Sequence, residues 1–258
     1  RRSGELVEAA APIDVLARRD AEYAGLPLER GMVYEAQGEA DRATRMYEAA
    51  LRSRHDDPDL LLRLGAAQVA AGQIDEAERT LARVANARPN SSEAEHFMGR
   101  VAFARGNTQG AQQHFDRAVS LDGTRGEYHL YAGWAALETG NFGKALEQVE
   151  AAIARDPSLG DAYWIRGEVR LRSGAVQDAL DDMQRALSLK PGRHEAWAGV
   201  AECYDQLRRR GDAIGAYMSA LQGDDDNGMW WYRLGRMQLD DDGSADAHIA
   251  LNRSVLLG

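Results

Sequence analysis

Apolar and polar positions along the chain follow a helical period, and the whole pattern recurs every thirty-four residues. Residues 59–90 show it most clearly: two stretches with helical apolar spacing lie on either side of a turn at Gly72, and Pro89 follows the second stretch. The same arrangement reappears when this window is shifted by thirty-four residues. The sequence therefore predicts a stack of helical hairpins.

Four registers carry this period. The first is a small residue in the first helix: Gly31, Gly65, Gly99, Gly133, Gly167, Ala201 and Gly235. Twelve residues later comes an alanine: Ala43, Ala77, Ala111, Ala145, Ala179, Ala213 and Ala247. Four residues further on is a large apolar residue: Tyr47, Leu81, Phe115, Val149, Met183, Tyr217 and Leu251. Three residues later comes Ala50, Val84, Ala118, Ala152, Ala186, Ala220 or Ser254. The spacings of four and three place these residues on one helical face, where small residues let helices approach and large ones fill the gap.

Glycines and prolines mark the helix ends. The turns carry Gly38, Gly72, Gly106, Gly140 and Gly174, which we expect to take the left-handed conformation that ends a helix. Pro89, Pro157 and Pro191 are predicted to stop the second helix of their repeats.

These residues and their spacing resemble the tetratricopeptide repeat (TPR) family, whose repeat is a thirty-four-residue antiparallel helix pair. The resemblance implies an all-α fold, a right-handed superhelical solenoid. It covers seven repeats: 24–57, 58–91, 92–125, 126–159, 160–193, 194–227 and 228–258. Repeat 6 departs from the pattern with Arg208 at its turn, and repeat 7 has Asp240 to Gly243 there. Residues 1–23 do not continue the pattern, and we expect one short helix, Ile13 to Tyr23, to dock on repeat 1.

The composition bounds the partners and the compartment. A net charge of -10 argues against nucleic acid and anionic membranes, both of which need concentrated positive charge. No apolar run is long enough to insert into a bilayer, so we expect a soluble protein, with the cytoplasm slightly favoured over the periplasm. Of 31 basic residues only Lys144 and Lys190 are lysines, a bias typical of GC-rich bacterial genomes. A first residue other than Met is consistent with a processed or excised chain.

The sequence shows no catalytic apparatus. His194-Glu195 begins like a zinc-protease motif, but Ala198 stands where the second histidine would be. The acidic run 224–228 lacks the glycine and glutamate spacing of a calcium loop. Cys203, the only cysteine, falls at an inward helical position and is predicted to be a buried structural thiol. We therefore expect a protein that is not an enzyme and has no cofactor and no metal.

The TPR resemblance implies a concave groove lined by repeat positions 2, 5, 9, 12 and 13. The candidate groove residues are His96, Arg100, Phe103, Leu130, Trp134, Leu137, Trp164, Glu168, Leu171, Arg172, Tyr232 and Arg236. The Lys and Asn clamp by which some TPR proteins hold chaperone tails is absent, which argues against that partner. Phe103, Leu130, Trp134, Leu137, Trp164 and Leu171 predict an exposed apolar centre that binds a peptide with apolar anchors and some basic character. Alternatively, Trp134 and Trp164 pack against the next repeat, and Trp197 and Trp231 are expected in the core.

The sequence thus favours a protein-protein interaction scaffold that binds a protein or peptide partner in its concave groove. Two alternatives stay open. One is an assembly element that forms homo-oligomers through the N-terminal helix and the apolar residues Val255 to Leu257. The other is a regulatory or adaptor region of a larger multidomain protein.

Overall fold

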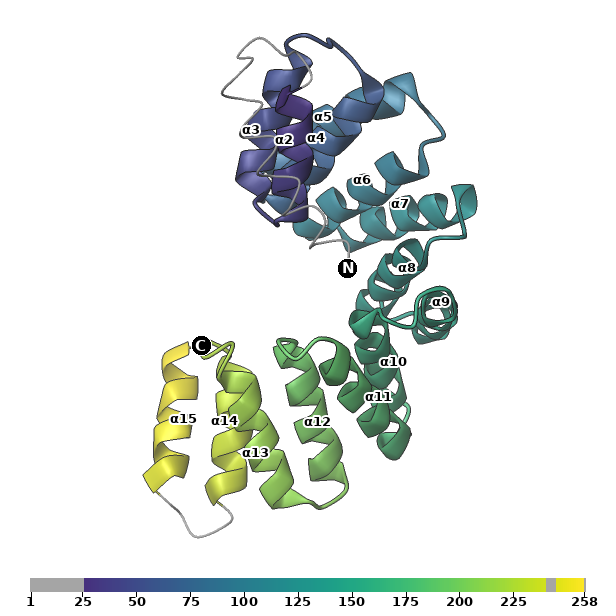
Figure 1. The fold of residues 1–258 in the computed structure, drawn as a ribbon. Coiled ribbons are helices and arrows are strands. Elements are labelled where there is room, and N and C mark those ends of the chain that lie inside the picture. Colours follow the sequence, from purple (N-terminus) through teal and green to yellow (C-terminus); the bar gives the residue numbers. More distant parts are fainter. Residues whose placement is uncertain (1–25, 240–244, 258) are drawn as a thin grey trace. The chain divides into compact units, whose positions relative to one another are not determined.

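The fold is all α-helical. The structure, a computed structural model, describes residues 26–239 and 245–257, and these residues form fourteen α-helices and no strand (Figure 1). The helices are α2 (Leu26–Ala36), α3 (Ala40–Leu51), α4 (Pro58–Ala70), α5 (Ile74–Ala87), α6 (Ser92–Ala104), α7 (Thr108–Leu121), α8 (Gly126–Glu138), α9 (Phe142–Arg155), α10 (Gly160–Arg172), α11 (Val176–Leu189), α12 (His194–Gln206), α13 (Arg210–Leu221), α14 (Gly228–Leu239) and α15 (Ala245–Leu257). The predicted all-α solenoid is confirmed.

The chain divides into two compact units, residues 1–123 and residues 124–258. Unit 1 holds helices α2 to α7 and unit 2 holds α8 to α15. In both units an even-numbered helix packs against the helix that follows it, which makes a hairpin, and the second helix of each hairpin packs against the next hairpin. First helices also touch each other in both units: α4 against α6 in unit 1, and α8 against α10 and α10 against α12 in unit 2. Each unit is therefore a stack of helical hairpins.

Local signals in the sequence set the helix ends. The Asp57 side chain accepts hydrogen bonds from the Asp59 and Leu60 backbone N–H groups, and Pro58 begins α4. Asn107 and Asn141 cap α7 and α9 in the same way. Each hairpin turn needs one residue in the left-handed region, and the five predicted glycines take it: Gly38, Gly72, Gly106, Gly140 and Gly174, with φ of 74°, 73°, 72°, 75° and 83°. This prediction is confirmed.

The turn between α12 and α13 reaches the same conformation without glycine. Arg208 has φ of 61° there, a region in which a Cβ atom is sterically unfavourable. A residue other than glycine in this region costs on the order of 1 kcal/mol. Repeat 6 therefore tolerates local strain at a position where repeats 1 to 5 avoid it.

The predicted pairing of small and large residues holds the hairpins closed. A Cβ atom added at Gly65 would lie 2.6 Å from Leu81 Cδ2, and one added at Gly99 would lie 2.5 Å from Phe115 Cε1. These distances are below van der Waals contact, so the large side chain occupies the space that the glycine leaves open. Ala43, Ala77 and the alanines in register with them are fully buried. The predicted helical face is confirmed as the core, although Leu251 and Ser254 in the last repeat are only half-buried.

Alanine at Gly133 is expected to destabilise unit 2 by about 1–3 kcal/mol, because its Cβ would lie 2.7 Å from Val149 Cγ1 and 3.3 Å from the Ala145 carbonyl oxygen. Gly143 in the same hairpin is the matched control. Nothing lies within 4 Å of a Cβ there, so alanine should raise stability by about 0.5–1 kcal/mol through helix propensity. Urea unfolding of both variants measures the difference, and equal effects would contradict the close-packing account.

The core differs between the units. In unit 2 one contiguous cluster of buried side chains extends from Leu130 in α8 to Ala250 in α15. In unit 1 the described buried side chains form separate clusters, one around Tyr47 and Leu64, one around Leu61 and Val84, and one around Leu81.

The last helix presents apolar side chains to solvent. Ile249, Val255 and Leu256 in α15 are 63%, 80% and 79% exposed. The expected docking helix, Ile13 to Tyr23, and the turn at Asp240 to Gly243 both lie outside the described residues. Among the helices that are described, none is both long and apolar enough to cross a bilayer.

Candidate functional site

In unit 1 the predicted groove residues on α6 pack against their own hairpin. His96 is 1% exposed, and its ring centroid lies 5.1 Å from that of Phe97 and 5.8 Å from that of Phe115. Phe103 is half-buried, with its centroid 5.9 Å from that of Phe115. The half-buried Arg100 lies over the Phe97 ring at 5.6 Å. His96 is therefore a core residue of this hairpin.

In unit 2 the first helices α8, α10, α12 and α14 together form one surface, which we call the first-helix face. Trp134 of α8 and Trp164 of α10 meet edge to face with their centroids 5.6 Å apart. Tyr131 stacks beside Trp134, with a centroid distance of 6.1 Å. The two tryptophans thus link two successive repeats, as in the alternative that they pack against a neighbour.

Arg193, just before α12, covers this aromatic cluster. Its guanidinium carbon lies 4.0 Å from the Trp164 ring centroid and 5.0 Å from that of Trp134, within cation–π range. Its Nε lies 3.4 Å from carboxylate oxygens of both Asp161 and Glu195. The Arg193 side chain is only 11% exposed, so packing on the rings and the two carboxylates hold this charge in place.

The four leucine and tryptophan side chains at the predicted apolar centre are largely covered. Leu130, Leu137, Trp164 and Leu171 are 5%, 5%, 8% and 6% exposed. The expectation that they form an exposed apolar surface is wrong, because helices of adjacent repeats and Arg193 cover them. Trp134 is half-buried and remains partly accessible at this place. That these residues bind a partner stays a prediction.

On the same face, the carboxylates of Glu138, Glu168 and Glu202 from successive first helices are close enough to influence one another electrostatically. Glu168 of α10 lies between Glu138 of α8 and Glu202 of α12, and its Oε1 would be 3.4 Å from a Cβ at Gly199. Burial, together with the charges of Glu202 and Glu138, raises the pKa of Glu168 to about 7, and Arg172 opposes this rise. Arg172 Nη2 forms a long ion pair with Glu168 Oε2 at 3.8 Å, and because the Arg172 side chain is 52% exposed this pair offsets the rise only in part. The first-helix face thus holds negative charge that is only partly compensated.

Cys203 lies under these carboxylates. It is fully buried, which confirms the prediction of a buried thiol. Burial and the nearby Glu168 and Glu202 raise the pKa of the thiol to about 12, so it does not ionise near neutral pH. Across the described ranges 26–239 and 245–257, no group of three or more His, Cys, Asp or Glu residues could hold a metal ion.

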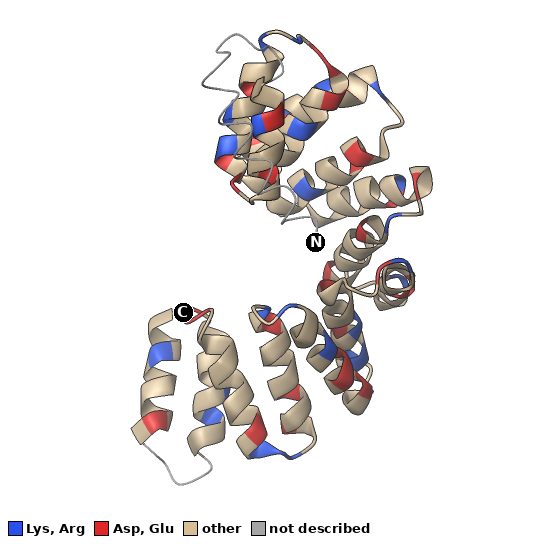
Figure 2. Cartoon of the chain, viewed as in Figure 1, with Lys and Arg blue, Asp and Glu red and all other residues tan. Residues whose placement is uncertain are grey.

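The far end of the first-helix face is basic. Figure 2 shows blue backbone in the turn between α12 and α13 and again on α14. A pocket of about 580 Å³ lies there, and its lining includes Arg208, Arg210, Arg233, Arg236, Asp205 and Tyr232. We call it the arginine pocket. The predicted residues Tyr232 and Arg236 are both exposed, and Arg236 lies 6.0 Å from the Tyr232 ring centroid.

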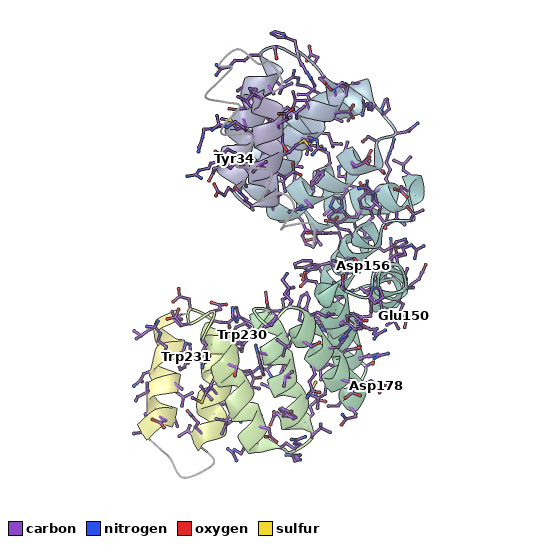
Figure 3. All side chains as sticks on the ribbon, in the orientation of Figure 1. Tyr34, Glu150, Asp156, Asp178, Trp230 and Trp231 are labelled. Atoms are coloured by element: carbon purple, nitrogen blue, oxygen red, sulfur yellow. The ribbon has the colours of Figure 1, made fainter. Side chains whose placement is uncertain are left out.

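The tryptophans expected in the core pack as predicted. Trp197 and Trp231 are half-buried against the core of unit 2. Trp231 lies beside Trp230 on α14 (Figure 3), and its Nε1 donates a hydrogen bond to the Asp225 carbonyl oxygen at 2.7 Å.

Sequence reasoning missed a buried ion cluster between α10 and α11. Asp182 is 4% exposed and accepts hydrogen bonds from Arg166 Nε at 2.9 Å, Arg166 Nη2 at 2.7 Å and Arg170 Nη1 at 2.8 Å. The hydrogen bonds that Arg166 donates to Asp182 raise the pKa of Arg166, although burial opposes this rise. The signal that could have found the cluster is an acid directly before the core position Met183, combined with two arginines four residues apart on the preceding helix.

Comparison with known sequences identifies one family. Sequence models described as tetratricopeptide repeat match residues 34–101, 97–159 and 130–194, which together are more than half of the chain. No curated protein matches the sequence.

Solved structures match the fold. A chain of the APC/C hetero-tetramer Cut9-Hcn1 superposes with a TM-score of 0.80 at 18% identity, over 98% of this chain and 50% of that one. The chain therefore spans half the length of that match. PilF of Pseudomonas aeruginosa gives a TM-score of 0.65 at 19% identity, over 78% of this chain and 93% of that chain. YrrB, described as a TPR protein with an unusual peptide-binding site, gives 0.52 at 16% identity, over 69% and 91%. At these identities the comparison shows the fold alone.

Proposed function

The chain belongs to the tetratricopeptide repeat family, a family of protein-interaction scaffolds, and from this premise we propose that it binds a polypeptide segment on the first-helix face of unit 2. The segment would lie across α8, α10, α12 and α14 and would carry basic side chains next to an apolar one. The proposal includes no catalytic step.

The observation that carries the proposal is the largely buried position of the Glu168 carboxylate beside other negative charges. This side chain is 20% exposed and lies among Glu138 and Glu202, and its one compensating cation, Arg172, is 3.8 Å away. A carboxylate with too little water and too little positive charge is raised in free energy when it ionises. A lysine or arginine of a partner would supply the missing charge, so binding would gain from an interaction that the free protein does not make.

The aromatic cluster supports an apolar contact beside these carboxylates. Trp134 is half-buried, and Arg193 and Trp164 hold its ring in place, so little side-chain entropy is lost when a partner packs on it. Rigid aromatic rings beside charged groups are frequent energetic anchors of interfaces. The apolar contact would thus be narrower than a continuous apolar groove, because Leu130, Leu137 and Leu171 are already covered.

Selection from a random peptide library displayed on phage tests the proposal. Peptides enriched on the intact chain should combine Lys or Arg with an apolar residue. Their affinity should fall by about tenfold or more for the double variant Glu168→Gln, Glu202→Gln, which corresponds to the loss of one charge-assisted contact. The control is Glu147→Gln, Glu150→Gln, which removes the same charge from exposed positions on α9. The proposal fails if no peptide is enriched, or if the control weakens binding as much as the double variant does.

A further inference from the structure

The arginine pocket concentrates positive charge on an acidic chain. Four arginines and one aspartate line it, on a protein whose net charge is -10. Arg208 and Arg210 come from the turn and the start of α13, and Arg233 and Arg236 come from successive turns of α14. Like charges placed around one cavity repel each other, so an anionic group that enters this pocket would relieve the repulsion.

Contacts with the protein hold the arginine side chains near the pocket. Arg210 donates from Nε to the Met237 carbonyl oxygen at 2.8 Å, and its Nη2 donates to the same oxygen. Arg233 Nη1 is 3.3 Å from Glu202 Oε1. Arg236 lies over the Tyr232 ring. The guanidinium groups of Arg210, Arg233 and Arg236 are therefore oriented before any ligand arrives, which lowers the entropy cost of binding.

Arg208 gives a second, independent reason to connect this pocket with function. It stands at the turn position where repeats 1 to 5 carry glycine, and its φ of 61° is unfavourable for any residue with a side chain. Local strain that the fold could avoid with glycine is typical of functional positions. Here the strained residue is one of those that line the arginine pocket.

We propose that the arginine pocket receives an acidic stretch of a partner polypeptide, whose Asp or Glu carboxylates pair with the guanidinium groups of Arg208, Arg233 and Arg236. Carboxylates match the planar donor geometry of arginine. The inference rests on the proposed function in that both place a polypeptide on the first-helix face. It adds that the bound segment is acidic where it reaches α14, next to a part that is basic where it reaches α10.

Titration of a fluorescein-labelled oligoglutamate peptide, followed by fluorescence anisotropy, tests this inference directly. We expect saturable binding that weakens as salt is added. Arg236→Ala and Arg208→Gly should each lower the affinity by about tenfold. Arg208→Gly should also raise the melting temperature, because it removes the strain, so lost binding could not be ascribed to unfolding. Arg209→Ala is the matched control, since Arg209 belongs to the same turn but pairs with Asp212 and Tyr204 instead of lining the pocket.

The possible results separate the explanations. The inference is supported if Arg208→Gly and Arg236→Ala lower the affinity for the oligoglutamate peptide while Arg209→Ala changes it little. No saturable binding, or equal loss in all three variants, overturns it, since equal loss indicates general attraction by charge. Tighter binding of a single-stranded oligonucleotide with the same dependence on Arg208 and Arg236 would also overturn it, in favour of a nucleic-acid ligand. The phage selection on Glu168 is a separate measurement, so failure of the arginine pocket leaves the proposed function standing and can be told apart from failure of the proposed function.

Discussion

Alanine at Asp182 is expected to lower the free energy of unfolding of unit 2 by about 3 kcal/mol. The variant removes three hydrogen bonds and leaves the guanidinium groups of Arg166 and Arg170 side by side without their shared carboxylate. These side chains are 19% and 30% exposed, so water compensates only part of the loss. The loss of stability comes mainly from the charges that remain. An uncompensated buried ion destabilises a protein more than replacement of the whole ion cluster by apolar residues does.

Urea unfolding followed by circular dichroism measures this effect. Asp181→Ala is the control, since Asp181 is the adjacent residue, is exposed, and bonds only to Gln177 in the same helix. It should change stability by less than about 0.5 kcal/mol. A loss as small in Asp182→Ala as in this control would show that the ion cluster contributes little to the fold.

Stability should also depend on pH through Glu168. Its pKa is 4.5 in the unfolded chain and about 7 in the folded one, so between these values the folded state binds a proton that the unfolded state releases. The stability that the protein gains from keeping this carboxyl protonated is fully present below pH 4.5 and is lost as the pH rises through about 7. The difference between the two pKa values corresponds to at most about 3 kcal/mol.

Glu168→Gln should remove this dependence, because glutamine keeps a neutral side chain at every pH. At pH 8 the variant is expected to be more stable than the parent chain by up to about 3 kcal/mol, and below pH 4.5 the two should be similar. Chemical unfolding at a series of pH values gives the comparison, with Glu147→Gln as an exposed control. A constant difference across the series would mean that Glu168 does not titrate in this range.

The fold could be predicted because its information is local and repeated. The turn glycines of repeats 1 to 5 and the spacing of Ala77 and Leu81 each specify a short-range geometry, and this geometry recurs from one repeat to the next. A signal too weak to interpret in one hairpin becomes clear when it recurs at the same interval. The prediction of buried positions on the second helices succeeded for the same reason.

The candidate site was harder to predict because it depends on contacts between repeats. Repeat position alone assigned both Trp134 and Trp164 to the exposed centre of the groove. In the structure, Arg193 and the neighbouring helices cover Trp164 more completely than Trp134. The raised pKa of Glu168 comes mainly from burial, to which carboxylates about thirty residues away on either side along the sequence add, and a periodic alignment shows neither effect. Tyr232 and Arg236 were named from their register, whereas the pocket they share with Arg208 comes from three different elements.

The difference between the two cores has a consequence for how substitutions combine. Side chains in the contiguous core of unit 2 share neighbours from one repeat to the next, so the effects of two substitutions there should depend on each other. The clusters of unit 1 are joined only through partly buried residues, Leu51 and Leu62, so substitutions in different clusters should depend on each other less than in unit 2. A substitution in the core of unit 2 should therefore require a compensating change elsewhere more often than one in unit 1.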